Sequence, residues 1–181
     1  PRSTLFPYTT LFRSHSPPIA APVHYSCYYA VDDCGDIKTG TPTITIADGI
    51  GTFSAEQTST DIIPGFQVDF GAGNTQCYVA EELSLSRYRL VTPLGTPCAA
   101  ATDQTVNYFR PPFSSLSAAE SGITGASYLT SGDLGTLDVD VSIYLGSVTV
   151  AGNFAWNAFS NTSAQDCWRL ITPREIGRAH V

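Results

Sequence analysis

The sequence predicts an all-β protein with one short helix, and three patterns support this. Residues 137–145 alternate aliphatic with polar side chains, the period of two expected of a half-buried strand. Residues 43–53 contain two alternating runs around Asp48 and Gly49, a pair suited to the positive φ angles of a tight hairpin turn. Further short apolar runs separated by turn residues lie at 66–70, 77–80, 88–91 and 106–109. Such a succession is typical of a small barrel or sandwich.

The remaining elements follow from local composition. Residues 15–23 are rich in proline, which cannot donate a backbone hydrogen bond, so we expect an extended linker there. Residues 25–31 form an aromatic run that predicts a strand. A helix of about two turns is expected at 115–120, with Ser115 or Ser117 as N-cap and Gly122 as its end. A short strand is expected at 148–150, after the strand at 137–145.

Composition limits the classes of partner. The formal net charge is −7 and no basic cluster is present, so the electrostatic footprint of a nucleic-acid-binding protein is missing from the sequence. No apolar run approaches the 18 or so residues of a membrane-spanning helix, so we expect none within residues 15–174. Lysine is scarce and methionine absent, a composition we associate with secreted or cell-surface β-proteins.

The five cysteines are Cys27, Cys34, Cys77, Cys98 and Cys167. Their spacing fits no zinc pattern, because it contains no Cys-x2-Cys pair. Disulfides such as Cys27 to Cys34 or Cys77 to Cys98 can form in an oxidising compartment. The odd number leaves one cysteine unpaired, and the alternative is that most of the cysteines are small buried apolar residues.

Both ends of the chain resemble sequence of a different origin. Residues 1–14 match the conceptual translation of a common short-read sequencing adapter, and residues 176–181 resemble the opposite adapter. We therefore expect residues 1–14 and 175–181 not to be native and exclude them from the interpretation of fold and function. On this interpretation the biological part is a fragment that covers residues 15–174.

Three segments together resemble a known architecture: the hairpin at 43–54, the helical segment at 113–120 and the stretch from Arg169 to Pro173. They are similar to the N-terminal part of large environmental surface proteins built on a right-handed parallel β-helix, the pectate-lyase-like architecture. The resemblance implies a small antiparallel β module, a short cap helix and the first coil of a parallel β-helix. It implies no site residue here, because lyases of this architecture place catalytic and calcium-binding residues on later coils.

Together, the adapter-like ends, the composition and the resemblance lead us to expect five segments. Residues 1–14 are adapter-derived, 15–30 a proline-rich linker and 31–107 the small antiparallel module. Residues 108–174 hold the cap helix and the start of the parallel β-helix, and 175–181 are adapter-derived again. The cap helix would cover the apolar end and unpaired edge of the first coil.

Two groups of residues are candidates for binding. Asp138 and Asp140 lie on one face of the strand at 137–145, close enough to share a calcium ion through oxygen ligands; a solvated strand face is the alternative. Tyr144 and Trp156, together with Tyr78 and Tyr88, can form an aromatic platform for a sugar ring, and burial in a core is the alternative for these side chains. Apart from calcium, no cofactor is expected.

No catalytic constellation emerges from the sequence. The histidines His15 and His24 both lie at or near the linker, and no Gly-x-Ser-x-Gly motif is present. Acidic residues that could act in pairs on a glycosidic bond, such as Glu81 and Glu82, cannot be placed together from sequence. Whether the whole protein is an enzyme therefore stays open.

The preferred interpretation is a non-catalytic N-terminal fragment of a secreted or cell-surface β-helix protein. Its role would be structural or binding, with adhesion or contact with a polysaccharide or cell-surface glycan as the expected partner. One alternative is a fragment of a polysaccharide lyase or glycoside hydrolase whose active site lies downstream. Another is a virion or tail surface protein. The sequence gives no indication of oligomeric state.

Overall fold

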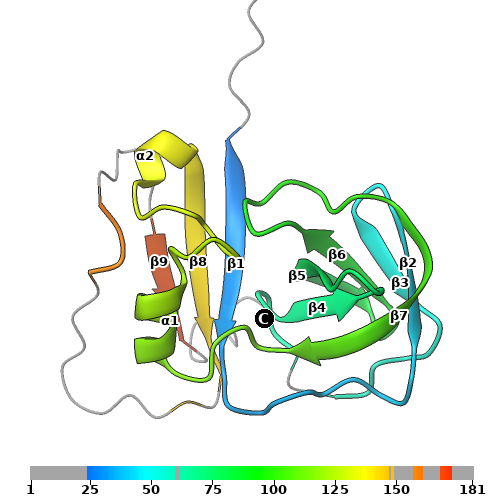
Figure 1. Ribbon diagram of the computed structural model, residues 1–181. Helices are drawn as coiled ribbons and strands as arrows, with labels where there is room; N and C mark the ends of the chain where they lie inside the picture. Colours follow the sequence, from blue (N-terminus) through cyan, green and yellow to red (C-terminus); the bar gives the residue numbers. More distant parts are fainter. Residues whose placement is uncertain (1–23, 60–61, 147, 149–156, 161–167, 173–181) are drawn as a thin grey trace, which may run out of the picture.

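The computed structural model describes residues 24–59, 62–146, 148, 157–160 and 168–172. These residues form a closed antiparallel barrel beside a three-stranded parallel sheet (Figure 1). The barrel contains β2 (Thr43–Ala47), β3 (Ile50–Phe53), β4 (Gln67–Phe70), β5 (Thr75–Ser84), β6 (Arg87–Val91) and β7 (Ala101–Arg110). The sheet contains β1 (Tyr25–Val31), β8 (Val139–Leu145) and β9 (Trp168–Ile171), and the helices are α1 (Leu116–Gly122) and α2 (Leu134–Leu137).

The barrel closes in the order β2-β3-β6-β5-β4-β7, with β7 pairing with β2. The predicted hairpin is confirmed as β2 and β3, and Asp48 and Gly49 at its turn have φ angles of 51° and 72°. Inward side chains fill the barrel, and the ring of Phe53 stacks on that of Phe109 at 5.5 Å between centroids. Closure removes the strand edges that an open sheet would expose.

In the parallel sheet, β8 lies between β1 and β9. The alternation predicted for β8 is confirmed, since Val139, Val141, Ile143 and Leu145 are buried in a core beside the barrel. The expected strand is wrong at its start. Leu137 ends α2, and Asp138 follows as the helix C-cap with a left-handed φ of 55°. A C-cap in this conformation interrupts the extended backbone that a strand requires.

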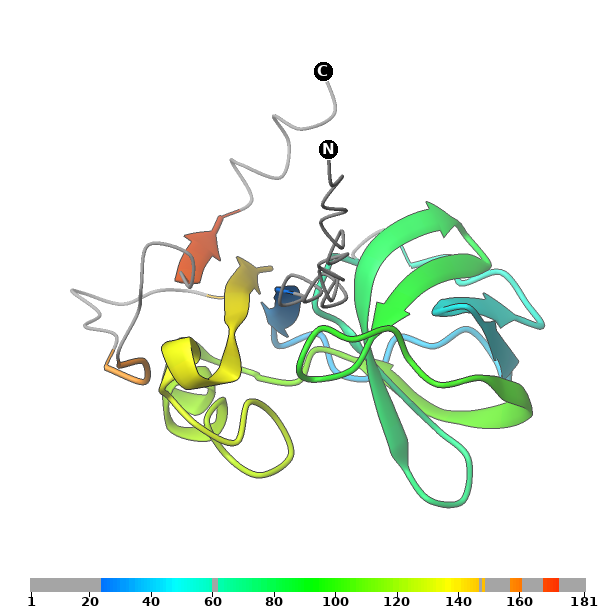
Figure 2. The same cartoon turned by 90° about the horizontal axis from the view of Figure 1, so that it is seen from above.

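Both helices lie against one face of the parallel sheet, while the barrel lies beside β1 (Figure 1, Figure 2). The helix predicted at 115–120 is confirmed as α1, and of the two N-cap candidates Ser115 holds the position. Its side-chain oxygen accepts a hydrogen bond from the Ala118 amide at 3.1 Å. The helix includes Gly122 and has Ile123 as its C-cap.

The expected first coil of a right-handed parallel β-helix is wrong, although the all-β class holds. The described residues contain a closed six-stranded barrel and a small parallel sheet instead. The strand that was expected to open the coil, β8, pairs with β1, which precedes the whole barrel in sequence: Tyr25 lies opposite Val139 and Val31 opposite Leu145. Strand β1 thus lies beside β8, where a parallel β-helix would place a strand of a neighbouring coil. Helix α1 consequently covers the face of a sheet and caps no stack of coils.

Close backbone contacts fix the barrel against β1. The Ala30 amide donates to the Gly65 carbonyl at 3.1 Å, and the Tyr29 hydroxyl donates to the Pro93 carbonyl at 2.6 Å. Gly65 has a φ of +92°, and a Cβ there would lie 2.3 Å from the backbone carbonyl carbon of Tyr29. No other residue type fits at this contact. Between β1 and the barrel, the rings of Tyr29 and Tyr78 pack edge to face, with 5.2 Å between their centroids.

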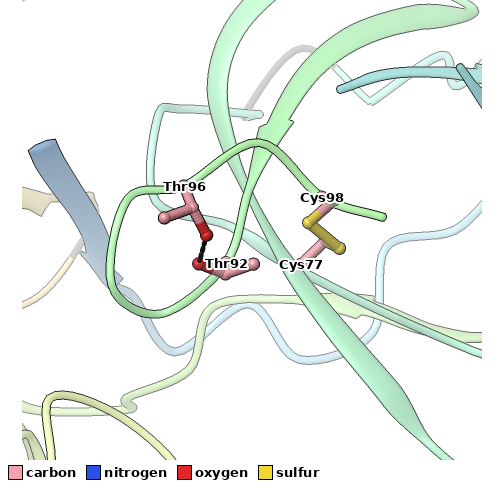
Figure 3. The surroundings of a disulfide bond; sticks show 4 residues. All are labelled: Cys77, Thr92, Thr96 and Cys98. Carbon is pink, nitrogen blue, oxygen red and sulfur yellow. Dashed lines mark hydrogen bonds between the residues drawn. A yellow bond between two sulfur atoms is a disulfide. The ribbon is translucent and has the colours of Figure 1, made fainter. Parts of the chain in front are cut away.

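One of the two proposed disulfides is present. Cys77 of β5 is bonded to Cys98, which lies in the segment after β6 (Figure 3). The other expected bond, between Cys27 and Cys34, is not formed: Cys27 is buried without a disulfide, and Cys34 is exposed. Cys167, Trp156 and the expected strand at 148–150, apart from Val148, lie outside the described residues. No helix in the described part of the chain is both long and apolar enough to cross a membrane.

Candidate functional site

The site with the best geometry for binding is an exposed tyrosine on the outer wall of the barrel. Tyr108 of β7 keeps 43% of its surface exposed. The other large apolar side chains exposed among the described residues are leucines, namely Leu83, Leu85 and Leu94. An exposed tyrosine offers a ligand an apolar ring and a hydroxyl together.

The strand itself turns Tyr108 outward. Phe109 is fully buried in the barrel core, so its neighbours Tyr108 and Arg110 both project from the outer wall. The pairing between β4 and β7 shifts register between Asp69 and Phe70, which lie opposite Tyr108 and Val106. The residue left between them, Asn107, donates from its side-chain amide to Asp69 at 2.8 Å and to the Gly71 carbonyl at 2.9 Å. These bonds hold the bulge beside Tyr108 in place.

Two cations lie close to the ring of Tyr108. The Arg110 guanidinium carbon lies 4.5 Å from the ring centroid, and the Lys38 ammonium lies 5.7 Å from it. Both distances fall within the range of a cation–π contact. We call Lys38, Tyr108 and Arg110 together the Tyr108 surface.

Lys38 is held in position by its own loop. The Lys38 ammonium donates to the Asp36 carboxylate and to the Asn107 carbonyl, the latter at 2.9 Å. Asp36 also accepts from the backbone amides of Phe109 at 2.9 Å and Lys38 at 3.2 Å. Desolvation of the Asp36 carboxyl acts to raise its pKa, but the hydrogen bonds from Lys38 and Phe109 outweigh it, and the pKa lies below its usual value. Asp36 thereby neutralises much of the charge on Lys38, whereas Arg110 forms no ion pair with a carboxylate of the described residues.

The structure describes three of the four aromatic residues of the predicted sugar platform, and Tyr78 and Tyr88 are fully buried. Tyr144 lies half-buried on β8, where its ring is 6.4 Å from that of Tyr28 on β1 and inclined by 30°. Burial raises the pKa of the Tyr144 phenol, with a further contribution from Tyr28, and the nearby Arg169 opposes the rise. Trp156 lies outside the described residues. The pairing of Tyr144 with Trp156 therefore stays a prediction.

The predicted calcium ligands surround a histidine. The Nδ1 atom of His24 lies 3.0 Å from the Asp138 carboxylate, and its Nε2 atom lies 3.5 Å from that of Asp140. The hydrogen bond to Asp138 raises the pKa of His24, Asp140 adds to the rise, and desolvation opposes it. Among the described residues no group of three His, Cys, Asp or Glu side chains is arranged to hold a metal ion. Calcium at Asp138 and Asp140 stays a prediction.

The arrangement around His24 differs from that of a catalytic base. A base that activates a nucleophile has one ring nitrogen on the nucleophile and the other on an orienting acid. In His24 both nitrogens face carboxylates, one at the end of α2 and one in β8. The contacts of His24 with Asp138 and Asp140 therefore connect the start of β1 to the start of β8.

A hollow of about 330 Å³ lies at one end of the barrel. It is lined by Phe70, the turn formed by Gly71, Ala72 and Gly73, Thr75, the run from Ala99 to Ala101, and Gln104. The lining contains no charged side chain, so it offers shape but few groups that could orient a ligand.

Tyr108 and Arg110 were missed by reasoning from sequence. The run at 106–109 was expected to be a strand, and the alternation around Phe109 was available as a signal that Tyr108 and Arg110 share its opposite face. That signal does not tell which outward faces of a barrel are covered by other elements. The hydrogen bond from Lys38 to the Asn107 carbonyl, which joins residues 69 apart in sequence, also has no local signature.

Comparison with models of protein families, with curated proteins and with solved structures finds no match to this chain. The function is therefore argued from the geometry alone.

Proposed function

We propose that the chain belongs to a secreted or cell-surface protein and that its barrel is a carbohydrate-binding module. The sugar would pack against Tyr108, with Lys38 and Arg110 beside it. In a cell-surface protein this contact would serve adhesion to a polysaccharide or glycan. The observation that carries the proposal is the 43% exposure of an aromatic ring that has two cations within cation–π distance, on a disulfide-bonded barrel.

The chemistry of a sugar fits this surface. A pyranose ring has an apolar face of C–H groups, which gains from contact with an aromatic ring, and a rim of hydroxyls, which need hydrogen-bonding partners. Tyr108 offers the ring, and its neighbours offer N–H donors. The wall around it is rigid, because β7 is paired on both sides, with β2 and β4. A rigid aromatic side chain loses little entropy when it binds.

Two features support the location. The Cys77–Cys98 disulfide is of a kind that persists in oxidising compartments. The net charge of −7 and the scarcity of lysine agree with the surface of a secreted β-protein. The alternative roles of the whole protein, as a polysaccharide lyase or glycoside hydrolase or as a virion or tail surface protein, stay predictions that the described residues do not test.

The proposal is tested with the full chain on an array of neutral and acidic oligosaccharides, followed by calorimetric titration of the oligosaccharides that bind. Tyr108→Ala should weaken binding by about tenfold or more, since loss of one aromatic anchor commonly removes more than about 1.4 kcal/mol. Leu85→Ala is the matched control, because Leu85 is similarly exposed at 44% in the β5–β6 turn and should bind as the wild type does. Absence of binding to every sugar, or equal affinity of Tyr108→Ala and wild type, would overturn the proposal.

A further inference from the structure

The cations of the described residues differ in whether a carboxylate neutralises them. Lys38 is paired with Asp36, and Arg89 donates to Glu81 at 3.0 Å. Arg110 has no ion pair with a carboxylate in the described part of the chain. In a protein with a net charge of −7, a guanidinium left unpaired beside an exposed aromatic ring is the feature that most needs a functional explanation.

The contact with Tyr108 prepares Arg110 for an anion. The Arg110 guanidinium lies over the ring, with its central carbon 4.5 Å from the centroid, and its N–H groups donate no hydrogen bond to a described residue. Those N–H groups form a planar fork that matches the two oxygens of a carboxylate. The ring also restricts the side chain, so less entropy is lost when a carboxylate binds.

Two carboxylates around the Tyr108 surface, those of Asp36 and Asp69, already accept hydrogen bonds from other residues. Asp36 accepts hydrogen bonds from the Lys38 ammonium and from the Phe109 amide, and Asp69 accepts one from Asn107 and is only 5% exposed. Lys38 adds a second positive charge 5.7 Å from the Tyr108 ring. Because Asp36 pairs with Lys38, the guanidinium of Arg110 is the charge at the Tyr108 surface that is left without a carboxylate among the described residues, although the chain as a whole is acidic.

We infer that Arg110 makes the Tyr108 surface selective for sugars that carry a carboxylate, the uronic acids, over the corresponding neutral sugars. This inference rests on the proposed function. The sugar ring packs on Tyr108 while its carboxylate accepts two hydrogen bonds from Arg110. The overall negative charge of the protein opposes long, dense polyanions, so the selectivity concerns one acidic residue of a glycan.

A matched pair of disaccharides tests the selectivity. Cellobiouronic acid and cellobiose differ in one carboxylate that replaces a hydroxymethyl group, and each is titrated into the full chain at low and high salt. The wild type should bind cellobiouronic acid about tenfold more tightly than cellobiose, the effect of a bidentate charged hydrogen bond on a partly exposed surface. High salt should reduce this ratio.

Variants of Arg110 identify the group responsible. Arg110→Gln should abolish the preference for cellobiouronic acid over cellobiose, because it weakens binding of the acidic disaccharide more than binding of the neutral one, and Arg110→Lys should retain part of the preference. Arg87→Gln is the control, because Arg87 is exposed on β6 and likewise has no ion pair with a described carboxylate. Equal wild-type affinity for both disaccharides, or a preference that survives in Arg110→Gln, would overturn the inference while the proposed function stands. If the chain binds no sugar, the proposed function fails and the inference with it.

Discussion

Asp36 is the residue on which the Tyr108 surface most depends. Its carboxylate binds the Lys38 ammonium and the Phe109 amide, so it fixes both the cation and the strand that presents Tyr108. The pKa of Asp36 in the folded protein lies below its usual value: desolvation acts to raise it, but the bonds from Lys38 and Phe109 outweigh the desolvation. A carboxyl whose pKa is lowered by folding stabilises the protein above its unfolded pKa, and this contribution is lost as the pH falls through the folded pKa.

Asp36→Asn should therefore lower the free energy of unfolding at neutral pH by about 1 kcal/mol, the range of partly exposed ion pairs. The difference from wild type should shrink as the pH falls through the folded pKa of Asp36, which lies below the usual range, because the wild-type carboxyl becomes protonated there. Urea unfolding at a series of pH values measures this. Asp33→Asn is the control for an exposed aspartate in the same loop. A constant difference between Asp36→Asn and wild type across the series would contradict the role given to the Asp36 charge.

At the scale of elements, the segment after β6 connects the barrel to the parallel sheet. Thr92 and Thr96 bond to each other through their hydroxyls at 2.7 Å, and the Thr92 amide donates to the Thr96 carbonyl (Figure 3). Gly95 lies so close to β1 that a Cβ there would be 2.5 Å from the Ser26 carbonyl oxygen. The disulfide from Cys98 to Cys77 anchors the other end of this segment to β5.

Replacement of both Cys77 and Cys98 by alanine should lower the free energy of unfolding by about 3 kcal/mol, the value expected for a crosslink that closes a loop of this length. The sequence separation is 21 residues. Thermal and urea unfolding provide the measurement, and a reducing agent should destabilise the wild type more than the double variant. If the double variant unfolds like the wild type, the segment after β6 is held by its other contacts alone.

At the scale of the whole molecule, local patterns predicted the elements but not their assembly. The alternation in β8, the Asp48-Gly49 turn and the Ser115 cap all depend on residues close in sequence, and these predictions were confirmed. The pairing of β1 with β8 joins residues separated by the entire barrel, for which no local signal exists. The resemblance to a parallel β-helix therefore led to a wrong prediction of how the strands pair.

The candidate site shows the same limit. Tyr78 and Tyr108 both project from the barrel wall, and sequence alternation treats them alike. Tyr78 is fully buried because the parallel sheet and Tyr29 cover it, whereas Tyr108 faces solvent. Which outward side chain becomes a binding surface depends on where the second sheet docks, and that is decided by the tertiary structure.

Sugar binding at the outer wall around Tyr108 is the proposal on which the inference about Arg110 depends. The most direct measurement is a titration of the isotope-labelled full chain with cellobiouronic acid, followed by amide and side-chain NMR. The shift changes should centre on Tyr108, Arg110 and Lys38 and fade toward β8. Changes centred on Tyr28 and Tyr144, or no change at millimolar sugar, would contradict the proposal.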